Sequence, residues 1–310
     1  MLLLLETLHP DAEALLAVHD RVLLAQDDVD TLDIARQGGV TGILTRGKGK
    51  ITRELMQACG AALKAVSRVG AGLDTVAVVA AKAMGIAVIY APGRNAQTVA
   101  EHAIMLMMLA GRKAALLNAN VKAGNWAVRN GYEGIELNGK VLGVIGLGNI
   151  GTRVAQIGQA LGMRVVYWSR STRDDRFEFR ELDALLQEVD VISLHLPLND
   201  ATKGMLGARE LALMKPTAIL VNTARGALID QVALADALHN DKLGAFAADV
   251  LAQQPPDPND PLLKSERVTL TPHVAGLTDT TYRDVCLFCA ANVLAVVKGD
   301  APDARSVFSG

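Results

Sequence analysis

A glycine-rich turn near the middle of the chain has the residue types and spacing that bind a dinucleotide. A strand is predicted over residues 141–145, and three glycines follow it in the spacing G-x-G-x-x-G before a helical pattern begins. The first glycine makes the tight turn, the second lets the backbone approach a pyrophosphate, and the third lets the helix pack closely. The amino end of that helix then stabilises the phosphates. The residues expected to contact a dinucleotide here are Gly146, Gly148, Asn149, Ile150 and Gly151.

The residues after the next predicted strand, which ends at Trp168, bear on the choice of cofactor. NAD-preferring sites place Asp or Glu at this point to hold the ribose hydroxyls, and none stands here. Arginines and hydroxyls could instead bind the 2′-phosphate of NADP. Asp174 and Asp175, just beyond, favour the alternative of a solvated basic turn. The sequence therefore favours NADP over NAD, with contacts from Ser169, Arg170, Ser171 and Arg173.

Polar residues also follow three later predicted strands, at Arg225, Asp249 and His273. Reduction of a 2-keto acid needs a cation for the carboxylate and carbonyl, a proton donor, and a polar group that orients this donor. Open α/β sheets bind ligands at the carboxyl ends of their strands. Taken singly, an arginine or a histidine at a turn is more often structural.

The elements that must position these residues alternate between short apolar runs and helical patterns, which predicts an α/β fold with parallel sheets. One long helix is expected from Thr98, in a capping box with Glu101, to about Lys122. The last helix is expected over about residues 280–297. Strands are expected at 2–5, 21–24, 42–45, 65–68, 87–90, 141–145, 164–168, 190–195, 218–222, 244–250 and 268–271. A chain of 310 residues exceeds what one core usually supports, so two domains are expected.

Composition narrows the functional classes. With 50% hydrophobic and 21% charged residues the chain is globular, and its net charge of −2 lacks the basic excess of a nucleic-acid-binding protein. The longest apolar run, Ala103–Ala110, falls well short of the ~20 residues of a membrane span, so none is expected. Three cysteines cannot form a disulfide framework, which favours a reducing, cytoplasmic location. Cys286 and Cys289 form C-x-x-C inside a helical pattern and are expected to be core residues, and no metal site is expected.

The combination of motifs resembles the D-isomer-specific 2-hydroxyacid dehydrogenases, a family that includes glyoxylate/hydroxypyruvate reductase, phosphoglycerate dehydrogenase, D-lactate dehydrogenase and formate dehydrogenase. The most specific segments are 146–151, 195–198, 214–230 and 270–276. The resemblance implies two doubly wound parallel-sheet domains. A Rossmann cofactor domain (97–283) would be inserted into a flavodoxin-like substrate domain (1–96 plus 284–310). It also implies a homodimer that acts on a small 2-keto or 2-hydroxy acid, without nucleic-acid or membrane partners.

The resemblance further implies roles for individual residues. Arg225 would hold the substrate carboxylate and polarise the keto oxygen, His273 would be the acid/base, and Asp249 would bind the nicotinamide carboxamide. Further cofactor contacts would come from Thr98, Pro197, Thr202, Thr223 and Ala224. The substrate carboxylate would meet the backbone amides of the loop that contains Gly70, Ala71 and Gly72. Arg46 and Arg68 resemble arginines that bind a substrate phosphate in phosphoglycerate dehydrogenases, and a basic surface pair is the alternative.

Gln254 departs from the family pattern, which usually has Glu before this proline, hydrogen-bonded to the catalytic histidine. Glutamine can orient the imidazole but adds no charge to stabilise the imidazolium, so reduction should decline at a lower pH than with Glu. Formate dehydrogenases also carry Gln here. We therefore favour an NADP(H)-dependent reductase of small 2-keto acids such as glyoxylate or hydroxypyruvate. The alternatives are a formate dehydrogenase-like enzyme and a nucleotide-sensing protein without catalytic activity.

Overall fold

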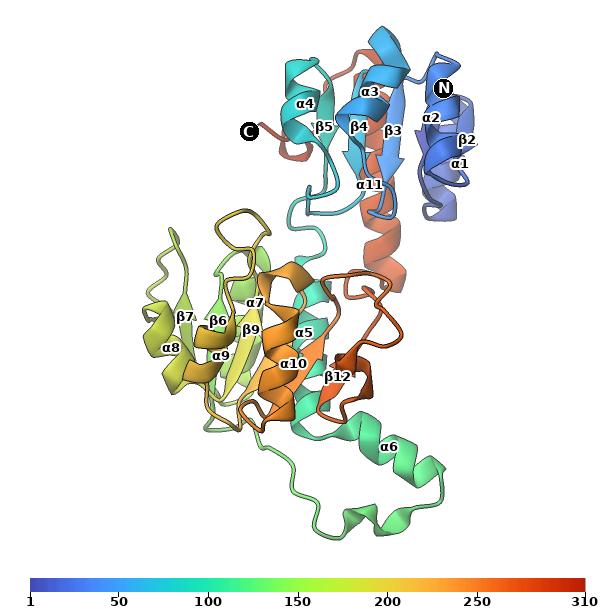
Figure 1. Cartoon of the computed structure of the whole chain (residues 1–310). Coiled ribbons are helices and arrows are strands. Elements are labelled where there is room, and N and C mark those ends of the chain that lie inside the picture. The colour runs from blue at the N-terminus through green and yellow to red at the C-terminus, as the bar shows by residue number, and fades with distance from the viewer. Residues whose placement is uncertain (310) are drawn as a thin grey trace. The chain divides into compact units, whose positions relative to one another are not determined.

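The computed structural model describes residues 1–309, which form two compact units (Figure 1). The first unit comprises Met1–Asn95 and Leu277–Gly310, and the second comprises Ala96–Gly276. The sequence placed the return of the chain to the first unit at residue 284. The units place it at Leu277 because helix α11 (Asp279–Lys298) belongs whole to the first unit, and a boundary at 284 would divide it.

The first unit is built on a parallel sheet of five strands in the order β2-β1-β3-β4-β5. This is the flavodoxin-like, doubly wound order that the sequence predicted. The strands are β1 (Leu2–Leu4), β2 (Val22–Leu24), β3 (Gly42–Thr45), β4 (Ala65–Arg68) and β5 (Ala87–Ile89). Strands β1 and β3 are buried throughout, which explains why they read as continuous apolar runs.

Helices cover both faces of this sheet. One face packs against α1 (Pro10–His19) and α11, and the other against α2 (Asp28–Arg36), α3 (Arg53–Cys59) and α4 (Val78–Ala83). Short 3₁₀ segments lie at Gly60–Ala62 and Ala304–Ser306. The two covered faces give this unit its own hydrophobic core.

Helix α11 is long and apolar enough, by length and composition alone, to cross a membrane, although the sequence analysis expected no such segment. It escaped notice because its apolar residues are interspersed with polar ones. In the structure its buried face, which includes Cys286, Cys289 and Val293, packs in the core of the first unit. Core helices of soluble proteins meet the same criteria, so the helix is a weak indication of a membrane span. Both cysteines of the C-x-x-C motif are free and buried, as predicted.

The second unit is built on a seven-stranded parallel sheet in the order β12-β11-β10-β9-β6-β7-β8, and this order reverses between β6 and β9 as in a Rossmann fold. Every strand predicted in this half is present: β6 and β7 have the predicted bounds, and the others are shifted at one or both ends. The two-residue strand β8 was missed because so short a run has no readable pattern. The strands are β6 (Val141–Ile145), β7 (Arg164–Trp168), β8 (Glu178–Phe179), β9 (Val191–Leu194), β10 (Ile219–Asn222), β11 (Ala245–Ala248) and β12 (Val268–Leu270).

Helices α5 (Ala96–Gly111) and α7 (Asn149–Ala160) cover one face of this sheet. The other face packs against α8 (Leu182–Glu188), α9 (Ala208–Leu213) and α10 (Gln231–His239). Short 3₁₀ segments lie at Trp126–Arg129, Gly226–Leu228 and Pro261–Lys264.

The single helix predicted from Thr98 to about Lys122 is wrong in two respects. Helix α5 begins at Ala96, so Thr98 lies within its first turn, where it is buried, and Glu101 accepts a hydrogen bond from Gln97 at 2.9 Å. The helical run also breaks at Lys113, whose φ of 49° is left-handed, before α6 (Ala114–Lys122) begins. A left-handed residue cannot continue an α-helix.

A projecting segment, residues 112–140, contains α6 and the loop that follows it. None of its residues is buried, and Figure 1 shows it extending away from the sheet of the second unit. The loop folds back to the start of the segment, where the Tyr132 hydroxyl donates to the carbonyl of Arg112 at 2.8 Å.

Candidate active site

The candidate site in the second unit is a row of residues one place beyond the ends of neighbouring strands. Ile145, Leu194, Asn222, Ala248 and Leu270 are register partners across β6, β9, β10, β11 and β12. The next residue of each strand forms a row that we call the carboxyl edge, in which parallel register places the side chains on one face of the sheet. The carboxyl edge consists of Gly146, His195, Thr223, Asp249 and Thr271.

Backbone hydrogen bonds continue the register into this row. His195 N donates to Ile145 O at 2.8 Å, and Asp249 N donates to Asn222 O at 3.0 Å. Thr271 N donates to Ala248 O at 2.9 Å. The carboxyl edge is therefore as regular as the sheet itself, and rigid elements position its side chains.

The glycine turn has the geometry that a dinucleotide requires. Gly146 has a φ of 98°, and a Cβ added there would lie 2.6 Å from the carbonyl oxygen of His195. A Cβ on Gly151 would lie 2.0 Å from the carbonyl oxygen of Gly146, so only glycine lets α7 approach the turn. A Cβ on Gly148, the N-cap of α7, would meet nothing within 4 Å. The open space is therefore at the amino end of the helix, where a pyrophosphate is stabilised.

The turn after β7 holds two arginines in different surroundings. The Arg173 guanidinium lies over the Phe179 ring at 3.9 Å and donates to the carbonyls of Ser169 and Thr172, each at 3.0 Å. Arg170 and Ser171 are exposed. Asp174 pairs with Arg176, which lowers the pKa of that carboxyl, so this acid does not neutralise the turn.

A buried asparagine shapes the loop that carries Arg225. The Asn222 amide oxygen accepts from Ala224 N at 2.9 Å, and its nitrogen donates to the Arg225 carbonyl at 2.9 Å. A Cβ on Gly226 would lie 2.0 Å from the carbonyl carbon of Leu251, so this glycine lets the loop approach the segment that follows Asp249. Nη1 of Arg225 donates to the Ala224 carbonyl at 2.7 Å.

His273 and Gln254 lie together, as the sequence predicted, with Nδ1 of the histidine 2.8 Å from Oε1 of the glutamine. Nε2 of Gln254 donates to the Leu251 carbonyl at 3.1 Å, and because a carbonyl only accepts, this contact fixes which way the amide points. Nδ1 of His273 must therefore carry a hydrogen. Nε2 is then the ring nitrogen at which the imidazole can gain or lose a proton.

Asp249 supports the backbone around His273. Its carboxylate is 1% exposed and accepts from Thr271 Oγ1 at 2.5 Å, Val274 N at 2.9 Å and Ala275 N at 2.8 Å. His102, from α5, approaches the same carboxylate at 3.5 Å. The sequence analysis missed His102, although it lies one helical turn after Thr98 and therefore on the same face of α5.

The remaining predicted cofactor residues of the second unit differ in burial and in whether their polar groups already have hydrogen-bond partners. Thr223 Oγ1 is buried without a partner, an arrangement that suits a polar group of a ligand. The Thr202 hydroxyl donates to the Pro197 carbonyl at 2.7 Å and accepts from Asn199 N at 2.9 Å, so it holds the loop after β9. Pro197 is exposed, and Ala224 is half-buried.

His195, which the sequence analysis did not single out as a site residue, lies in the same row. Its Nε2 is 2.8 Å from Ser193 Oγ, and its Nδ1 is buried without a partner. Burial lowers the pKa of His195 to about 3, so the ring is neutral at physiological pH.

The predicted substrate residues lie in the first unit. The Arg68 guanidinium occupies the space beside Gly70, where an added Cβ would lie 1.5 Å from Nη1, and Gly70 has a φ of 150°. Ala71 and Gly72 are half-exposed. Arg46 pairs with Glu6 at 3.1 Å, and Glu6 Oε1 also accepts from the backbone nitrogens of residues 46, 47 and 48, each at 2.8 Å. Arg46 is therefore not an unpaired basic surface residue.

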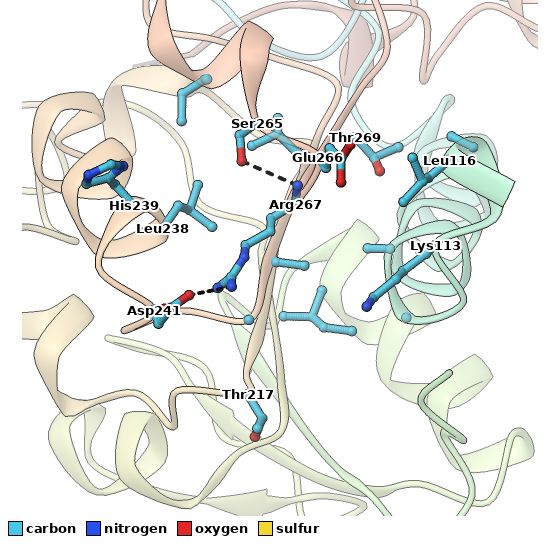
Figure 2. A pocket seen from close by; sticks show the side chains of 18 of the residues that line it. Lys113, Leu116, Thr217, Leu238, His239, Asp241, Ser265, Glu266, Arg267 and Thr269 are labelled. Atoms are coloured by element: carbon cyan, nitrogen blue, oxygen red, sulfur yellow. Dashed lines mark hydrogen bonds and ion pairs between the residues drawn. The ribbon is translucent and has the colours of Figure 1, made fainter. Parts of the chain in front are cut away.

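A cavity of about 1000 Å³ in the second unit lies away from these residues (Figure 2). Thr217, Gly244 and Arg267 line it next to the amino ends of β10, β11 and β12, and Arg267 pairs there with Asp241. In a parallel sheet the amino and carboxyl ends form opposite edges, so this cavity is separate from the carboxyl edge. Within residues 1–309, no group of three or more His, Cys, Asp or Glu side chains is arranged to hold a metal ion.

The Rossmann sheet, the glycine turn and the polar carboxyl edge together define a protein of the dinucleotide-binding class. The sequence profile of the D-isomer specific 2-hydroxyacid dehydrogenase NAD-binding domain matches residues 104–275. The chain is 40% identical to a glyoxylate reductase of Aeropyrum pernix over 77% of its length and 75% of the relative's. It therefore belongs to the D-isomer-specific 2-hydroxyacid dehydrogenase family, whose members oxidise the CH–OH group of their donors with NAD(P).

Two further comparisons agree with this assignment. A D-3-phosphoglycerate dehydrogenase of Archaeoglobus fulgidus is 39% identical over 83% of this chain, which spans about half (49%) of that protein. The crystal structure of a glyoxylate reductase from Paecilomyes thermophila superposes with a TM-score of 0.89 at 30% identity, covering 99% of this chain and 98% of that one.

Solved structures of similar fold hold different cofactors. A glyoxylate/hydroxypyruvate reductase of Sinorhizobium meliloti, described as NADPH-dependent and solved with NADP and malonate, has a TM-score of 0.87 and 26% identity over 99% of this chain and 96% of that one. A D-lactate dehydrogenase of Aquifex aeolicus, solved with NAD and lactic acid, has a TM-score of 0.87 and 28% identity over 97% and 96% of the two chains.

Proposed function

We propose that the chain is an NADP(H)-dependent reductase of small, unphosphorylated 2-keto acids of the glyoxylate and hydroxypyruvate class. The observation that carries the proposal is the arrangement beside the carboxyl edge. There, Gly226 brings the Arg225 loop against the segment that leads to Gln254, and Gln254 orients His273. This arrangement brings a cation, an acid/base and its orienting group to one region of the second unit.

The bound nicotinamide would supply hydride for reduction of the keto carbon and accept it in the reverse direction. Arg225 binds the substrate carboxylate and polarises the keto oxygen, since its planar guanidinium can make two parallel contacts. His273 donates a proton from Nε2 to that oxygen during reduction and takes it back during oxidation. Gln254 keeps the hydrogen of Nδ1 engaged, and this leaves Nε2 for the substrate. For Gly70, Ala71 and Gly72, in the first unit, a contact of the backbone amides with the substrate remains a prediction from the family resemblance.

The residues present fit a dinucleotide. Gly148 leaves open space at the amino end of α7, and the unpartnered Thr223 hydroxyl offers a hydrogen bond at the carboxyl edge. Asn149, Ile150, Thr98, Pro197, Ala224 and Asp249 remain predicted cofactor contacts. The turn after β7 has no acid at residues 169–173 to repel a 2′-phosphate, which supports NADP over NAD. Arg170, exposed, and Arg173, held over Phe179, are the cations we assign to that phosphate.

The substrate class is supported by Arg46. A substrate phosphate would have to compete with Glu6 for this guanidinium, and the Glu6 carboxylate is only 10% exposed. Even a half-buried ion pair is costly to separate when its carboxylate also accepts several backbone hydrogen bonds. We therefore propose a substrate without a phosphate group, in line with the reductases among the relatives.

The enzyme is further proposed to be a homodimer in the cytoplasm. The apolar run Ala103–Ala110 offers little of an interface because most of it is buried in the core of the second unit. The projecting segment 112–140 is the better candidate. It exposes Val121 (45%) and Trp126 (67%), and a nine-residue helix such as α6 is marginal without packing against another surface. A second copy of the chain is the partner we assign to it.

Two experiments test these proposals. Initial rates with a panel of keto acids and with NADPH or NADH, read as nicotinamide absorbance, should show turnover of glyoxylate or hydroxypyruvate with a lower KM for NADPH. Formate-driven reduction of NADP would support the formate dehydrogenase alternative, and NADPH binding without turnover would support the sensor. Light scattering should give the mass of a dimer, and Trp126→Asp should shift it toward the monomer. A monomeric wild type would contradict the dimer.

A further inference from the structure

A chain of polar contacts crosses three elements of the second unit behind His273. Nε2 of His102, on α5, lies 2.8 Å from Thr271 Oγ1, just past the end of β12. Thr271 Oγ1 lies 2.5 Å from Asp249 Oδ1, just past the end of β11. The Asp249 carboxylate in turn accepts hydrogen bonds from the backbone amides of Val274 and Ala275. The chain of contacts therefore ends on the backbone that directly follows His273.

The hydrogen positions in this chain follow from its chemistry. An ionised carboxylate only accepts hydrogen bonds, so the Thr271 hydroxyl must donate its one hydrogen to Asp249. The Thr271 oxygen can then only accept from His102, which requires a hydrogen on Nε2 of that ring. In the other neutral tautomer, Nε2 of His102 would be an acceptor. It would then compete with Asp249 for the single hydroxyl hydrogen.

From this we infer that His102, carrying its hydrogen on Nε2, is a positioning residue for His273. It acts by holding the Thr271 hydroxyl on Asp249 and so fixing the 271–275 loop. The inference rests on the proposed function for His273 and deepens it.

The loop needs such support because its backbone conformation is unfavourable. His273 has a φ of 57°, a left-handed conformation that a residue with a side chain adopts only when its surroundings impose it. The side chain of Asp249 is 1% exposed and that of His102 is 14% exposed, so water competes little for these contacts. Besides the contacts to the Asp249 carboxylate, the His273 amide donates to the Asp249 backbone carbonyl at 2.9 Å. Nε2 of His102 completes this set of donors around Asp249 and Thr271.

The first test needs no substrate. Among the six histidines of the chain, the ring of His102 is assigned by comparing ¹⁵N spectra of the wild type and His102→Ala. We expect a hydrogen on Nε2 at neutral pH. A ring with its hydrogen on Nδ1 alone would overturn the inference, because Thr271 could not then be held as described.

The second test measures hydrogen exchange of the Val274 and Ala275 amides, the two that donate to Asp249. In Thr271→Val and His102→Ala these amides should exchange at least tenfold faster, whereas amides within β6 should keep the wild-type rate. His102→Gln should restore much of the protection, because its amide nitrogen can replace Nε2 as a donor. A uniform increase across the sheet in all three variants would indicate general destabilisation and contradict a positioning role.

The third test separates this inference from the proposed function. With wild-type turnover established, His102→Ala and Thr271→Val should each lower kcat about 10- to 100-fold, since small displacements of a catalytic group have effects of that size. The double variant should be little worse than either single one, because both interrupt the same chain of contacts. The fall in kcat should exceed any rise in the KM for NADPH, which the variants can affect only through Asp249, a predicted cofactor contact. His19→Ala, at the surface of the first unit, is the control. Additive losses would overturn the inference. If the wild type turned over no keto acid, the proposed function would fail, and the ring and exchange measurements would still decide the role of His102.

Discussion

The carboxyl ends of the two parallel sheets differ in what fills them. In the first unit, the Glu6 carboxylate accepts hydrogen bonds from the backbone amides of residues 46–48 and pairs with Arg46. The Arg68 guanidinium lies beside Gly70. In the second unit, Gly148 leaves open space, and the side-chain atoms Thr223 Oγ1 and His195 Nδ1 are buried without partners.

The two ends thus differ in whether an anion of the chain itself meets the backbone amides. The first sheet supplies its own anion, although Nε of Arg46 and Oγ of Ser67, on β4, are buried without partners. The second sheet leaves open space at its glycine turn, with the unpartnered Thr223 hydroxyl on the same edge. Since doubly wound sheets bind ligands at their carboxyl ends, the second sheet is the one we expect to bind the dinucleotide.

The largest expected effect is at Arg225. Arg225→Ala should lower kcat/KM about 10³-fold or more, because the carboxylate anchor and the polarisation of the carbonyl are both lost. Arg225→Lys should recover only part, since an ammonium group cannot make the forked contact. Steady-state kinetics with glyoxylate measure both variants, with Arg36→Ala, an exposed arginine of the first unit, as the control. Near-normal activity of the alanine variant would show that the site lies elsewhere.

The turn after β7 comes next. Replacing Arg170 and Arg173 together by Ala should raise the KM for NADPH about 100-fold or more and leave the KM for NADH nearly unchanged, since each charge-assisted contact is worth about 1.5–3 kcal/mol. Kinetics with both cofactors measure this. The matched control is Arg176→Ala, which removes the nearby arginine that pairs with Asp174. Equal losses with NADPH and NADH would contradict the proposed contact with the 2′-phosphate.

In the first unit, Glu6→Gln removes the negative charge at the carboxyl end of the sheet. It should lower the free energy of unfolding by about 1.5–3 kcal/mol, because Arg46 would lose its charged partner while partly buried. Asp33→Asn, which removes the acid of the exposed pair with Arg36, should change it by less than about 1 kcal/mol. Urea unfolding measures both variants. Equal effects would mean that the Glu6 contacts are no more important than a surface ion pair.

Gln254→Glu places a negative charge beside His273, where the wild type has a neutral amide. Reduction requires protonated His273, and a carboxylate 2.8 Å away would favour that form. The decline of kcat/KM with rising pH should therefore move about one to two pH units higher. A competing effect is repulsion between the new carboxylate and the Leu251 carbonyl, which in the wild type accepts a hydrogen bond from the Gln254 amide. The pH profiles of both proteins with NADPH test this, and identical profiles would show that residue 254 does not influence the acid/base.

The last prediction concerns the pH dependence of stability and His195. Burial lowers its pKa from 6.5 to about 3 in the folded chain. Between about pH 3 and pH 6.5, His195 is therefore protonated in the unfolded chain but neutral in the folded chain. The contribution of His195 to the free energy of unfolding is therefore fully present above about pH 6.5. It decreases as the pH falls, by at most about 1.4 kcal/mol per pH unit. Urea unfolding of the wild type and of His195→Gln across this range gives the difference, and parallel curves would contradict the buried neutral ring.

The sequence by itself determined the two α/β units, most of the strands and the glycine turn, because these depend on local periodicity and on the backbone freedom of single residues. It also placed Arg225, Asp249 and His273 at strand ends, and it indicated that Gln254 faces His273. The placement of Arg225, Asp249 and His273 needs only the rule that the ends of parallel strands meet at one edge, whereas the pairing of Gln254 with His273 came from the resemblance to the family.

Only the tertiary structure decided which side chains meet across that edge. The contacts of His102 with Thr271 and Asp249 join residues far apart in the sequence, and no local pattern encodes them. The sequence likewise did not predict the break in the helical run at Lys113 or the two-residue strand β8. Packing against distant elements sets both, and it can override the helical or strand preference of a short segment. The pairing of Glu6 with Arg46 is of the same kind, because it depends on the register of β1 and β3 rather than on either segment alone.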